Sequence, residues 1–386
     1  MKKLLFSIFV LGAFLVSCTQ KSVVTVTIEN TSDFDRKSDI VEVTLEEVIS
    51  KVKLDNGQVY VVKNSAGEII PSQITNNGKL IFQSGTAANS TATFTIEPGT
   101  PQEFEAKTYG RFITERKDDF AWENDRVAFR IYGPALVETD GPSNGIDAWF
   151  KRTDKMIIDK WYKNDLAGAA SYHEDHGEGL DDYKVGRSLG AGAMAPYVND
   201  KLWLNENFVS QEVVENGPLR TTFKLTYKDL DVNGKTYTET RTFSIDAGSQ
   251  LTKIIQEYGG VEEPIAVAAG LVKRVNDSII SSIEDNYIVY AEPASEKVGN
   301  VYLGMVFPDG LDKMVVDTYH VENKDVKNGI PYSHVLGVVT YKPNTPVTYY
   351  TGYGWSKYGF ESFEDFRKYV EDFSKGLKQP LVVSLK

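Results

Sequence analysis

One segment, residues 171–193, holds the side chains best suited to chemistry. Its sequence is SYHEDHGEGLDDYKVGRSLGAGA, and it contains two of the four histidines of the chain. Its proton-exchanging and anion-binding side chains are His173, His176, Tyr183, Lys184 and Arg187. Imidazole, phenol and amine groups exchange protons, and an arginine can hold a carboxylate in a bidentate pair. The residue types therefore indicate acid–base chemistry beside a bound anion.

Removal of a proton next to a carboxylate, as in uronic acids, needs both proton-exchanging and anion-binding side chains. The carboxylate must first be neutralised, a base then takes the proton, and an acid protonates the departing oxygen. An arginine together with a histidine or a tyrosine supplies that set, and no cofactor is required. The segment therefore favours an elimination reaction on a uronate-containing sugar.

The spacing of the two histidines also supports other interpretations. His173 and His176 could hold a divalent metal together with nearby carboxylates. Gly177 and Gly179 argue against a helix that would align the two imidazoles, and a third histidine would have to come from a distant part of the chain. A third interpretation is a solvated loop on which both histidines are exposed and have no role.

A second group of polar and aromatic residues lies in AWENDRVAFRIYGPA (121–135). It alternates like a strand, with Val127, Phe129 and Ile131 on one face. The expected sugar-binding residues are Trp122, Glu123, Asn124, Arg126, Arg130 and Tyr132, with Lys184 from the first segment and Trp355 from GYGWSKYGF (352–360). Aromatic rings suit stacking on a sugar. The alternatives are a sheet face with solvated arginines and, around the late tryptophan, a buried aromatic corner.

The N-terminus, MKKLLFSIFVLGAFLVSC, is typical of an export signal, because two lysines precede an apolar run that ends at Cys18. The small residue before Cys18 resembles the lipobox of bacterial lipoproteins, so Cys18 is the expected lipidation site. It is the only cysteine, which excludes thiolate metal sites and disulfides from the rest of the chain. We therefore expect an exported bacterial lipoprotein, periplasmic or in the outer membrane, that meets the membrane only through its lipid anchor.

The charge of the chain limits its partners. A net charge of −12 disfavours a broad polyanion-binding surface, and nucleic acid is not expected as a partner. An acidic oligosaccharide held by a few local arginines remains compatible with this charge.

Short alternating segments separated by Asn, Gly and Pro predict a mainly β chain. The expected parts are a signal peptide (1–17), a lipidated tether (18–22), a small N-terminal β-sandwich (23–107) and a large antiparallel sandwich (108–386). Asn233 and Gly234 predict a tight hairpin turn. One helix is expected near the C-terminus, with Ser362 as its cap, Asp365 completing a capping box, and Gly376 as its stop.

Four stretches carry a family resemblance: FAWENDRVAFRIYGPAL, GIDAWFKRTDKMIIDKWY, YHEDHGEGLDDYKVGRSLGAGA and GYGWSKYGFES. They resemble a family of bacterial lipoproteins that is catalogued as a domain of unknown function and encoded in polysaccharide-utilisation clusters for pectin or ulvan. The resemblance runs from about Gly110 to the C-terminus and includes the N-terminal domain more loosely. It implies a galactose-mutarotase-like supersandwich, a fold that several polysaccharide lyases share.

The same resemblance implies roles for individual residues, because the family includes an oligosaccharide dehydratase of ulvan breakdown. That enzyme removes water from a uronate at the non-reducing end. By resemblance, His173 or His176 is the base or acid, Tyr183 is its partner, and Arg187 is the carboxylate clamp. The arginines of the stretch 121–135 form a reserve clamp.

The expected function is therefore a carbohydrate-active lipoprotein that eliminates water, or a glycosidic leaving group, from uronate-containing oligosaccharides. The alternatives are a non-catalytic glycan-binding lipoprotein and a glycoside hydrolase that uses two carboxylates. Elimination predicts that residues 122–132 and 173–187 form one pocket, with at least one arginine pointing inward.

Overall fold

The computed structural model of the chain describes residues 23–322 and 326–386. The expected signal peptide (1–17), the tether (18–22) and the lipidation site Cys18 lie outside the described residues. Within the described ranges, no helix is both long and apolar enough to cross a membrane.

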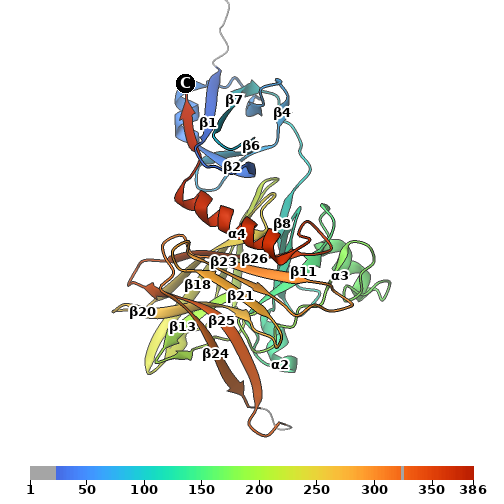
Figure 1. Ribbon diagram of the computed structural model, residues 1–386. Coiled ribbons are helices and arrows are strands. Elements are labelled where there is room, and N and C mark those ends of the chain that lie inside the picture. The colour runs from blue at the N-terminus through green and yellow to red at the C-terminus, as the bar shows by residue number, and fades with distance from the viewer. Residues whose placement is uncertain (1–22, 323–325) are drawn as a thin grey trace, which may run out of the picture.

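A small β-sandwich lies at one end of the molecule (Figure 1). Its elements are β1 (Val24–Asn30), β2 (Arg36–Thr44), α1 (Leu45–Lys51), β3 (Val59–Lys63), β4 (Ile69–Ile70), β5 (Ser72–Ile74), β6 (Lys79–Thr86), β7 (Ser90–Gly99) and β27 (Val382–Leu385). One sheet has the order β27-β1-β7-β3-β4 and the other β2-β6-β5. Alternate residues such as Val24, Val26 and Ile28 point into the core between the two sheets.

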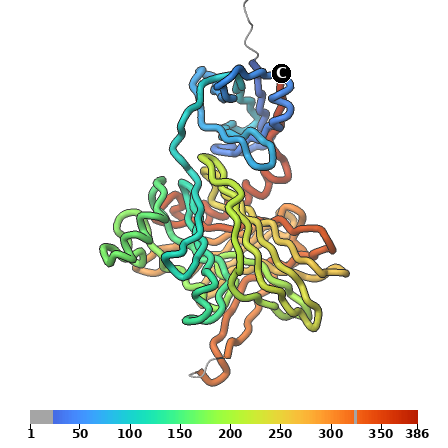
Figure 2. Tube along the Cα trace, turned by 180° about the vertical axis from the view of Figure 1, so that it is seen from behind, coloured from blue at the N-terminus to red at the C-terminus, as the bar shows by residue number. Residues whose placement is uncertain are grey.

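The last strand of the chain belongs to this small domain. β27 pairs antiparallel with β1, with Leu385 opposite Val26. The expected division at residue 108 therefore misplaces the C-terminal strand, which lies far from its sheet partner in sequence. Residues 100–107 form an extended connection to the large domain (Figure 2).

The large domain consists of three antiparallel sheets. Its strands are β8 (Thr108–Ile113), β9 (Asp119–Asn124), β10 (Ala128–Ile131), β11 (Ile146–Lys151), β12 (Gly179–Asp181), β13 (Ala191–Val198), β14 (Lys201–Leu202), β15 (Ser210–Asn216), β16 (Arg220–Thr226), β17 (Leu230–Val232), β18 (Lys235–Asp246), β19 (Leu251–Gly259), β20 (Ile265–Val272), β21 (Ser278–Ser282), β22 (Tyr287–Ala291), β23 (Val301–Val306), β24 (Lys313–Val321), β25 (Ile330–Tyr341) and β26 (Val347–Trp355). Its helices are η1 (Pro134–Leu136), α2 (Val137–Asp140), α3 (Ile158–Leu166) and α4 (Phe363–Lys378).

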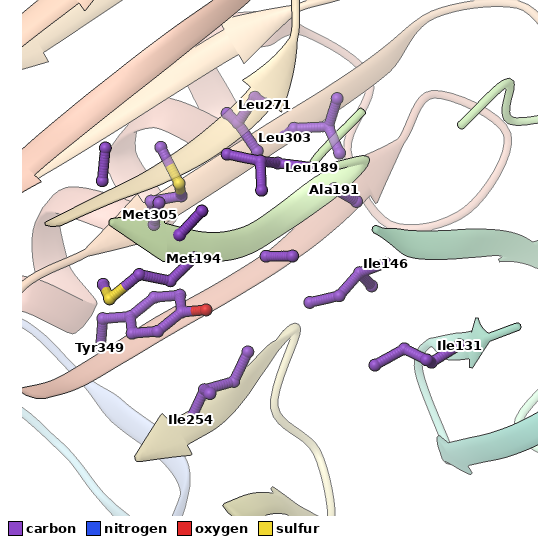
Figure 3. Packing of buried hydrophobic residues seen from close by; sticks show 14 of the residues in the cluster. Ile131, Ile146, Leu189, Ala191, Met194, Ile254, Leu271, Leu303, Met305 and Tyr349 are labelled. Atoms are coloured by element: carbon purple, nitrogen blue, oxygen red, sulfur yellow. The ribbon is translucent and has the colours of Figure 1, made fainter. Parts of the chain in front are cut away.

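The sheets have the orders β12-β11-β10-β9-β8, β14-β13-β20-β25-β24 and β15-β16-β18-β19-β26-β23-β22-β21, with β17 beside β18. Large side chains from all three fill one continuous core, in which Met194, Ile254, Leu303 and Tyr349 are fully buried (Figure 3). The expected fold class, a small sandwich followed by a large antiparallel supersandwich with one C-terminal helix, is confirmed.

Local sequence signals explain some element ends. Asn233 and Gly234 both have positive φ, 56° and 82°, so the hairpin between β17 and β18 has the expected tight turn. Ser362 and Asp365 form the expected capping box at the start of α4. The predicted stop at Gly376 is wrong, because α4 continues to Lys378. A Cβ on Gly376 would lie 2.8 Å from Cζ of Arg36, so the glycine makes room for the small domain.

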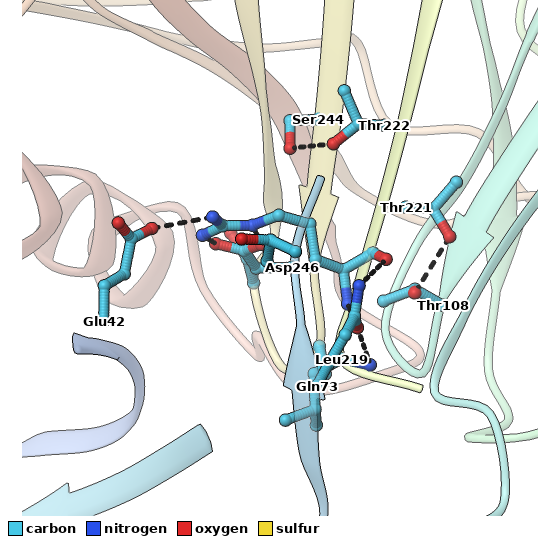
Figure 4. Close-up of polar contacts among 12 residues, drawn as sticks. Glu42, Gln73, Thr108, Leu219, Thr221, Thr222, Ser244 and Asp246 are labelled. Carbon is cyan, nitrogen blue, oxygen red and sulfur yellow. Dashed lines mark hydrogen bonds and ion pairs between the residues drawn. The ribbon is translucent and has the colours of Figure 1, made fainter. Parts of the chain in front are cut away.

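Polar contacts join the two domains (Figure 4). The side-chain amide of Gln73 accepts from the backbone N–H groups of Leu219 and Arg220 at 3.0 and 2.8 Å. Arg220 in turn pairs with Glu42 of the small domain at 2.7 Å and with Asp246 at 2.5 Å. The small domain is thus held by directional contacts at the end of the large sheet.

Candidate functional site

The two faces of the sheet β8–β12 differ in chemistry. Phe129, Ile131 and Phe150 point into the large core. The neighbouring residues point to the opposite side, because side chains alternate along a strand. Arg130 lies opposite Asp147 on β11, and Trp149 lies opposite Asp181 on β12, so these four side chains share the second face.

A long excursion, residues 152–178, covers this charged face. Its helix α3 packs Ile158, Trp161 and Tyr162 against Trp149. Two ion pairs fix the rest of the excursion. One joins Arg152 to Asp175 at 3.1 Å, and the other joins Lys160 to Glu178 at 2.8 Å. The charged side chains of the sheet are therefore enclosed under a cover formed by residues 152–178, which include α3.

We call Arg130, Tyr132, Asp147, His173 and Asp181 the aspartate cluster. Nη2 of Arg130 lies 2.6 Å from Oδ2 of Asp147 and 2.8 Å from Oδ2 of Asp181. The three side chains are at most 4% exposed. The hydroxyl of Tyr132 lies 3.3 Å from Oδ2 of Asp147, and its ring is only half-buried. Tyr132 thus connects the buried charges with the surface.

One guanidinium faces two carboxylates in this cluster, and this arrangement changes the acidity of Asp147. Burial and the neighbouring charge of Asp181 raise the pKa of Asp147 to about 6, although Arg130 opposes this change. Oδ1 of Asp147 is buried and has no hydrogen-bond partner among the described residues. Asp147 can therefore take up and release a proton near neutral pH, as a general acid or base must.

His173 lies at the outer edge of the aspartate cluster with a defined orientation. Its Nδ1 is 3.0 Å from the backbone oxygen of Asp181 and 3.5 Å from the Oδ2 atom of that residue. Both neighbours accept hydrogen bonds, so Nδ1 carries a hydrogen, and the neutral form of the ring has its lone pair on Nε2. The side chain is 53% exposed, and its ring packs edge-on against Tyr172. His173 is thus an oriented base that a ligand can reach.

His176 has a different environment, although it is only three residues away. Its Nε2 bonds to the backbone oxygen of Ser171 at 3.1 Å, and the residue lines a hollow of about 60 Å³ beside Trp161 and Tyr172. Over residues 23–322 and 326–386, no group of three or more His, Cys, Asp or Glu side chains is arranged to hold a metal ion. The structure therefore does not bring His173 and His176 together with a third ligand.

Two predicted sugar-stacking residues are core residues instead. Trp122 is fully buried, stacks against Phe129 and donates its Nε1 hydrogen to Thr252. Trp355 is 1% exposed and donates to the backbone oxygen of Val298 at 2.8 Å. Their proposed contact with sugar is wrong, because neither ring has an open face.

Glu123 and Asn124 are also structural. Glu123 is buried, pairs with Lys151 at 2.7 Å and accepts from the backbone N–H groups at the start of α3. Asn124 holds the turn before β10 by accepting from the N–H groups of Arg126 and Val127. Arg126 itself is exposed and lies 5.7 Å from the ring of Tyr358, outside the aspartate cluster. Only Arg130 and Tyr132 of this group join His173.

The second half of the first segment turns to the other side of β12. Tyr183 is buried and donates to the backbone oxygen of Gly190 at 3.1 Å. Burial, with a further contribution from Glu292, raises the pKa of Tyr183 well above its ordinary value. Its predicted role as an accessible proton donor is therefore wrong, because the hydroxyl is enclosed and already donates to the backbone.

We call Lys184, Arg187, Arg274 and Lys297 the cationic patch. Arg274 donates to the backbone oxygen of Lys184 at 2.5 Å, and Lys297 pairs with Asp182 at 2.6 Å. Arg187 is half-buried and donates to the backbone oxygen of Asn205. No carboxylate in the described chain forms an ion pair with it. Sequence reasoning missed Arg274 and Lys297, since both come from loops about 90 residues or more away.

The aspartate cluster and the cationic patch adjoin each other along the chain. Asp181 faces Arg130, whereas the next residue, Asp182, faces Lys297. The two predicted groups of residues therefore meet only in part. Residues 130–132 meet 173–181, whereas 183–187 lie beyond β12 with residues from the second half of the chain.

Comparison with known proteins places the chain among uncharacterised relatives. It is 31% identical over 385 residues to "Uncharacterized protein P7" of Formosa agariphila, which covers 93% of each chain. Among solved structures, an alpha-mannosidase from Enterococcus faecalis aligns with a TM-score of 0.47 at 9% identity over 95% of this chain. A glycosyl hydrolase family 38 protein from the same organism aligns with a TM-score of 0.49 at 10% identity over 95% of this chain.

The chain spans less than half the length of those two structures, 46% and 48% respectively. A heparinase III structure aligns over 68% of this chain and 38% of its own, with a TM-score of 0.35 at 13% identity. Residues 28–383 match a family described as "Domain of unknown function (DUF4861)". The match extends over both domains, and the chain belongs to the DUF4861 family.

Proposed function

We propose that this protein is a carbohydrate-active enzyme that eliminates water, or a glycosidic leaving group, from uronate-containing oligosaccharides. The observation that carries the proposal is the oriented base His173 beside Asp181, which shares Arg130 with Asp147. His173 contacts Asp181, and Arg130 links Asp181 to Asp147, whose pKa burial and the charge of Asp181 raise to about 6. An oriented imidazole and a carboxyl group of raised pKa in one cluster are suited to moving protons. The sugar substrate rests on the resemblance of the four sequence stretches.

The reaction assigns one task to each group. Nε2 of His173 takes the proton from the carbon next to the uronate carboxylate, and the electrons of that C–H bond form a C=C bond. The neighbouring C–O bond breaks, and its oxygen leaves with a proton supplied by Tyr132 and Asp147, whose oxygens lie 3.3 Å apart. Proton transfer by positioned groups of this kind contributes about 10²- to 10⁴-fold to a rate.

Binding of the uronate carboxylate is assigned to the cationic patch rather than to Arg130. Arg130 already serves two aspartates and is 2% exposed, so it has no free edge for a ligand. Lys184 and Arg187, in contrast, follow β12 in the chain, and Lys184 is exposed and Arg187 half-buried. A neutralised carboxylate is what makes the neighbouring proton acidic enough to remove.

Hydrolysis by two carboxylates is less well supported by this geometry. Asp147 and Asp181 accept from the same nitrogen of Arg130 at 2.6 and 2.8 Å. Carboxylates of glycosidases flank the scissile bond at roughly 5–10 Å, with the sugar between them. In this protein the space between the two aspartates is filled by a guanidinium.

The test is incubation with uronate-capped oligosaccharides from ulvan and from pectin. The conjugated unsaturated product is followed by ultraviolet absorbance, and the products are weighed by mass spectrometry. Loss of one water from an intact oligosaccharide identifies a dehydratase, and chain scission identifies a lyase. His173→Ala should lower the rate by about 10²- to 10⁴-fold without loss of fold.

His320→Ala is the matched control, because His320 is an exposed histidine on the distant strand β24. A rate that does not change in His173→Ala would refute the assignment of the base. Binding of these oligosaccharides without any turnover would instead favour a non-catalytic glycan-binding protein. Loss of activity with a chelator would indicate a divalent metal in the reaction.

A further inference from the structure

Arg274 is held in a fixed position at the edge of the cationic patch. Its Nη2 donates to the backbone oxygen of Lys184 at 2.5 Å, and its Cζ lies 5.7 Å from the ring centre of Tyr183. Its backbone N–H donates to the hydroxyl of Tyr290 at 2.7 Å. The side chain is nevertheless 31% exposed, so part of its guanidinium faces solvent.

The carboxylate partner of Arg274 is poorly placed. Oε1 of Glu292 lies 3.4 Å from Nε of Arg274, the longest arginine–carboxylate ion pair among the described residues. This contact is longer than a well-formed pair, and Oε1 of Glu292 is buried without a geometrically sound hydrogen bond in the described chain. A buried carboxylate oxygen without a donor is unfavourable, and a well-formed pair would place it near 2.8 Å.

A second pair, on helix α4, has the geometry of a well-formed arginine–carboxylate contact. Arg367 and Glu371 of α4 are 23% and 17% exposed, close to the 31% and 17% of Arg274 and Glu292. Their atoms are only 2.6 Å apart and hydrogen-bonded. Exposure alone therefore does not explain the loose contact at Arg274.

The surroundings of Glu292 oppose its negative charge. Burial raises the pKa of Glu292, and Asp182 and Asp277 add to this effect, whereas Arg274 acts against it. In the segment 184–187, neither Lys184 nor Arg187 forms a direct ion pair within the described chain, although Glu206 lies near enough to act on Arg187. The patch thus has cationic groups that its own carboxylates do not satisfy, in a chain with a net charge of −12.

We propose that Arg274 binds the carboxylate of the acidic sugar and that Glu292 is an internal competitor for the same guanidinium. The substrate carboxylate takes the bidentate position that Glu292 fills badly, and Glu292 gives up its contact. The inference rests on the proposed function only for the acidic class of the ligand. It concerns binding, so it can be tested without any turnover.

The experiment measures equilibrium binding by calorimetry, with a uronate-capped ulvan oligosaccharide and its carboxyl-reduced neutral counterpart as probes. All variants carry His173→Ala to prevent conversion. Glu292→Gln keeps the shape of the side chain and removes the competing charge, so affinity for the acidic probe should rise by about fivefold. Arg274→Gln should lower it by at least about tenfold. The neutral probe should respond to neither substitution.

Glu371→Gln and Arg367→Gln are the matched controls and should leave both affinities unchanged. Arg274→Lys serves as a second variant if Arg274→Gln does not fold, and it should bind more weakly than arginine because lysine cannot pair bidentately. Weaker or equal binding by Glu292→Gln, or full affinity in the arginine variants, would overturn the proposal. Opposite effects of the two substitutions in a protein without dehydratase activity would support this inference and refute only the proposed reaction.

Discussion

The carboxyl group of Asp147 is buried next to a second carboxylate, Asp181, with a single arginine to serve both. Its pKa of about 6 lies above the ordinary value of 3.8. Between these two pH values the folded protein holds a proton that the unfolded chain has released. The contribution of this group to stability is therefore complete at low pH and is lost as pH rises through about 6.

Asp147→Asn should remove that pH dependence. The variant leaves Arg130 with one carboxylate partner, Asp181, and takes away the charge that is costly to bury. We expect its unfolding free energy at pH 7.5 to exceed that of the wild type by about 1–3 kcal/mol, while activity falls. Urea denaturation at a series of pH values from 4 to 8 would measure the effect.

Asp159→Asn is the control for that series. Asp159 is 63% exposed and pairs with Arg111 at the surface, so its loss should change stability by less than about 1 kcal/mol at any pH. A less stable Asp147→Asn protein at pH 7.5 would show that the charge of Asp147 is needed to hold Arg130 in place.

At the residue scale, the sequence identified the types of side chain in the candidate site but only part of their arrangement in space. Alternation in the stretch 121–135 correctly places Arg130 and Tyr132 on one face, opposite Phe129 and Ile131. It does not reveal that Asp147 lies across from Arg130, because the pairing of β10 with β11 is set by tertiary contacts. Alternation along a strand also does not show whether one or both faces are buried. For this reason the sequence did not reveal that Trp122 is buried.

At the scale of elements, a carboxylate buried under the cover 152–178 fixes the start of α3. Glu123 accepts from the N–H groups of Ile157 and Ile158 at 2.8 and 2.9 Å and pairs with Lys151 at 2.7 Å. The helix start has no side-chain cap of its own, so an acidic residue from β9 supplies the missing acceptor. A residue expected to bind sugar thus anchors the cover.

Glu123→Gln should destabilise the protein by about 3–5 kcal/mol, because it leaves the ammonium group of Lys151 buried without a counter-charge. The loss would be measured as a lower midpoint in urea. The double variant Glu123→Gln with Lys151→Met should recover part of it, since the unpaired charge is then gone. A single variant as stable as the wild type would mean that the pair contributes nothing to the fold.

The sequence predicts well which helices and strands occur, and less well where each of them begins and ends. The hairpin turn at Asn233 and Gly234 and the capping box of α4 follow from short local signals. The helix α3 follows from no such signal, because its cap lies on another strand. Gly376 gave a local signal for a helix end that the structure does not use. This glycine instead makes room for Arg36.

At the scale of the whole molecule, the chain leaves the small domain after β7 and returns to it for its last strand. Thr25 and Lys386 exchange both backbone hydrogen bonds, so the next hydrogen-bonded pair is Thr27 with Ser384. The sequence predicts the two domains but not this return. Residues 382–385 alternate apolar and polar side chains, which predicts a strand but not the sheet that it joins.

Ser384→Pro should weaken the small domain, because proline removes a backbone N–H from the ladder between β27 and β1. We expect a loss of about 2–3 kcal/mol in the unfolding of this domain and a greater tendency to form dimers through the uncovered edge of β1. Calorimetry and light scattering would measure the two effects. Ser384→Ala, which keeps the N–H, should behave like the wild type, and equal behaviour of both variants would rule out a role for this edge.

The position of β27 also has a consequence for the order in which the protein is made. β1 leaves the ribosome before every strand of the large domain, but β27, which covers its outer edge, is synthesised after that domain. Throughout translation of the large domain, β1 therefore exposes unpaired backbone groups to other chains. A ribosome that stalls before β27 has been made releases a product in which the outer edge of β1 is still uncovered.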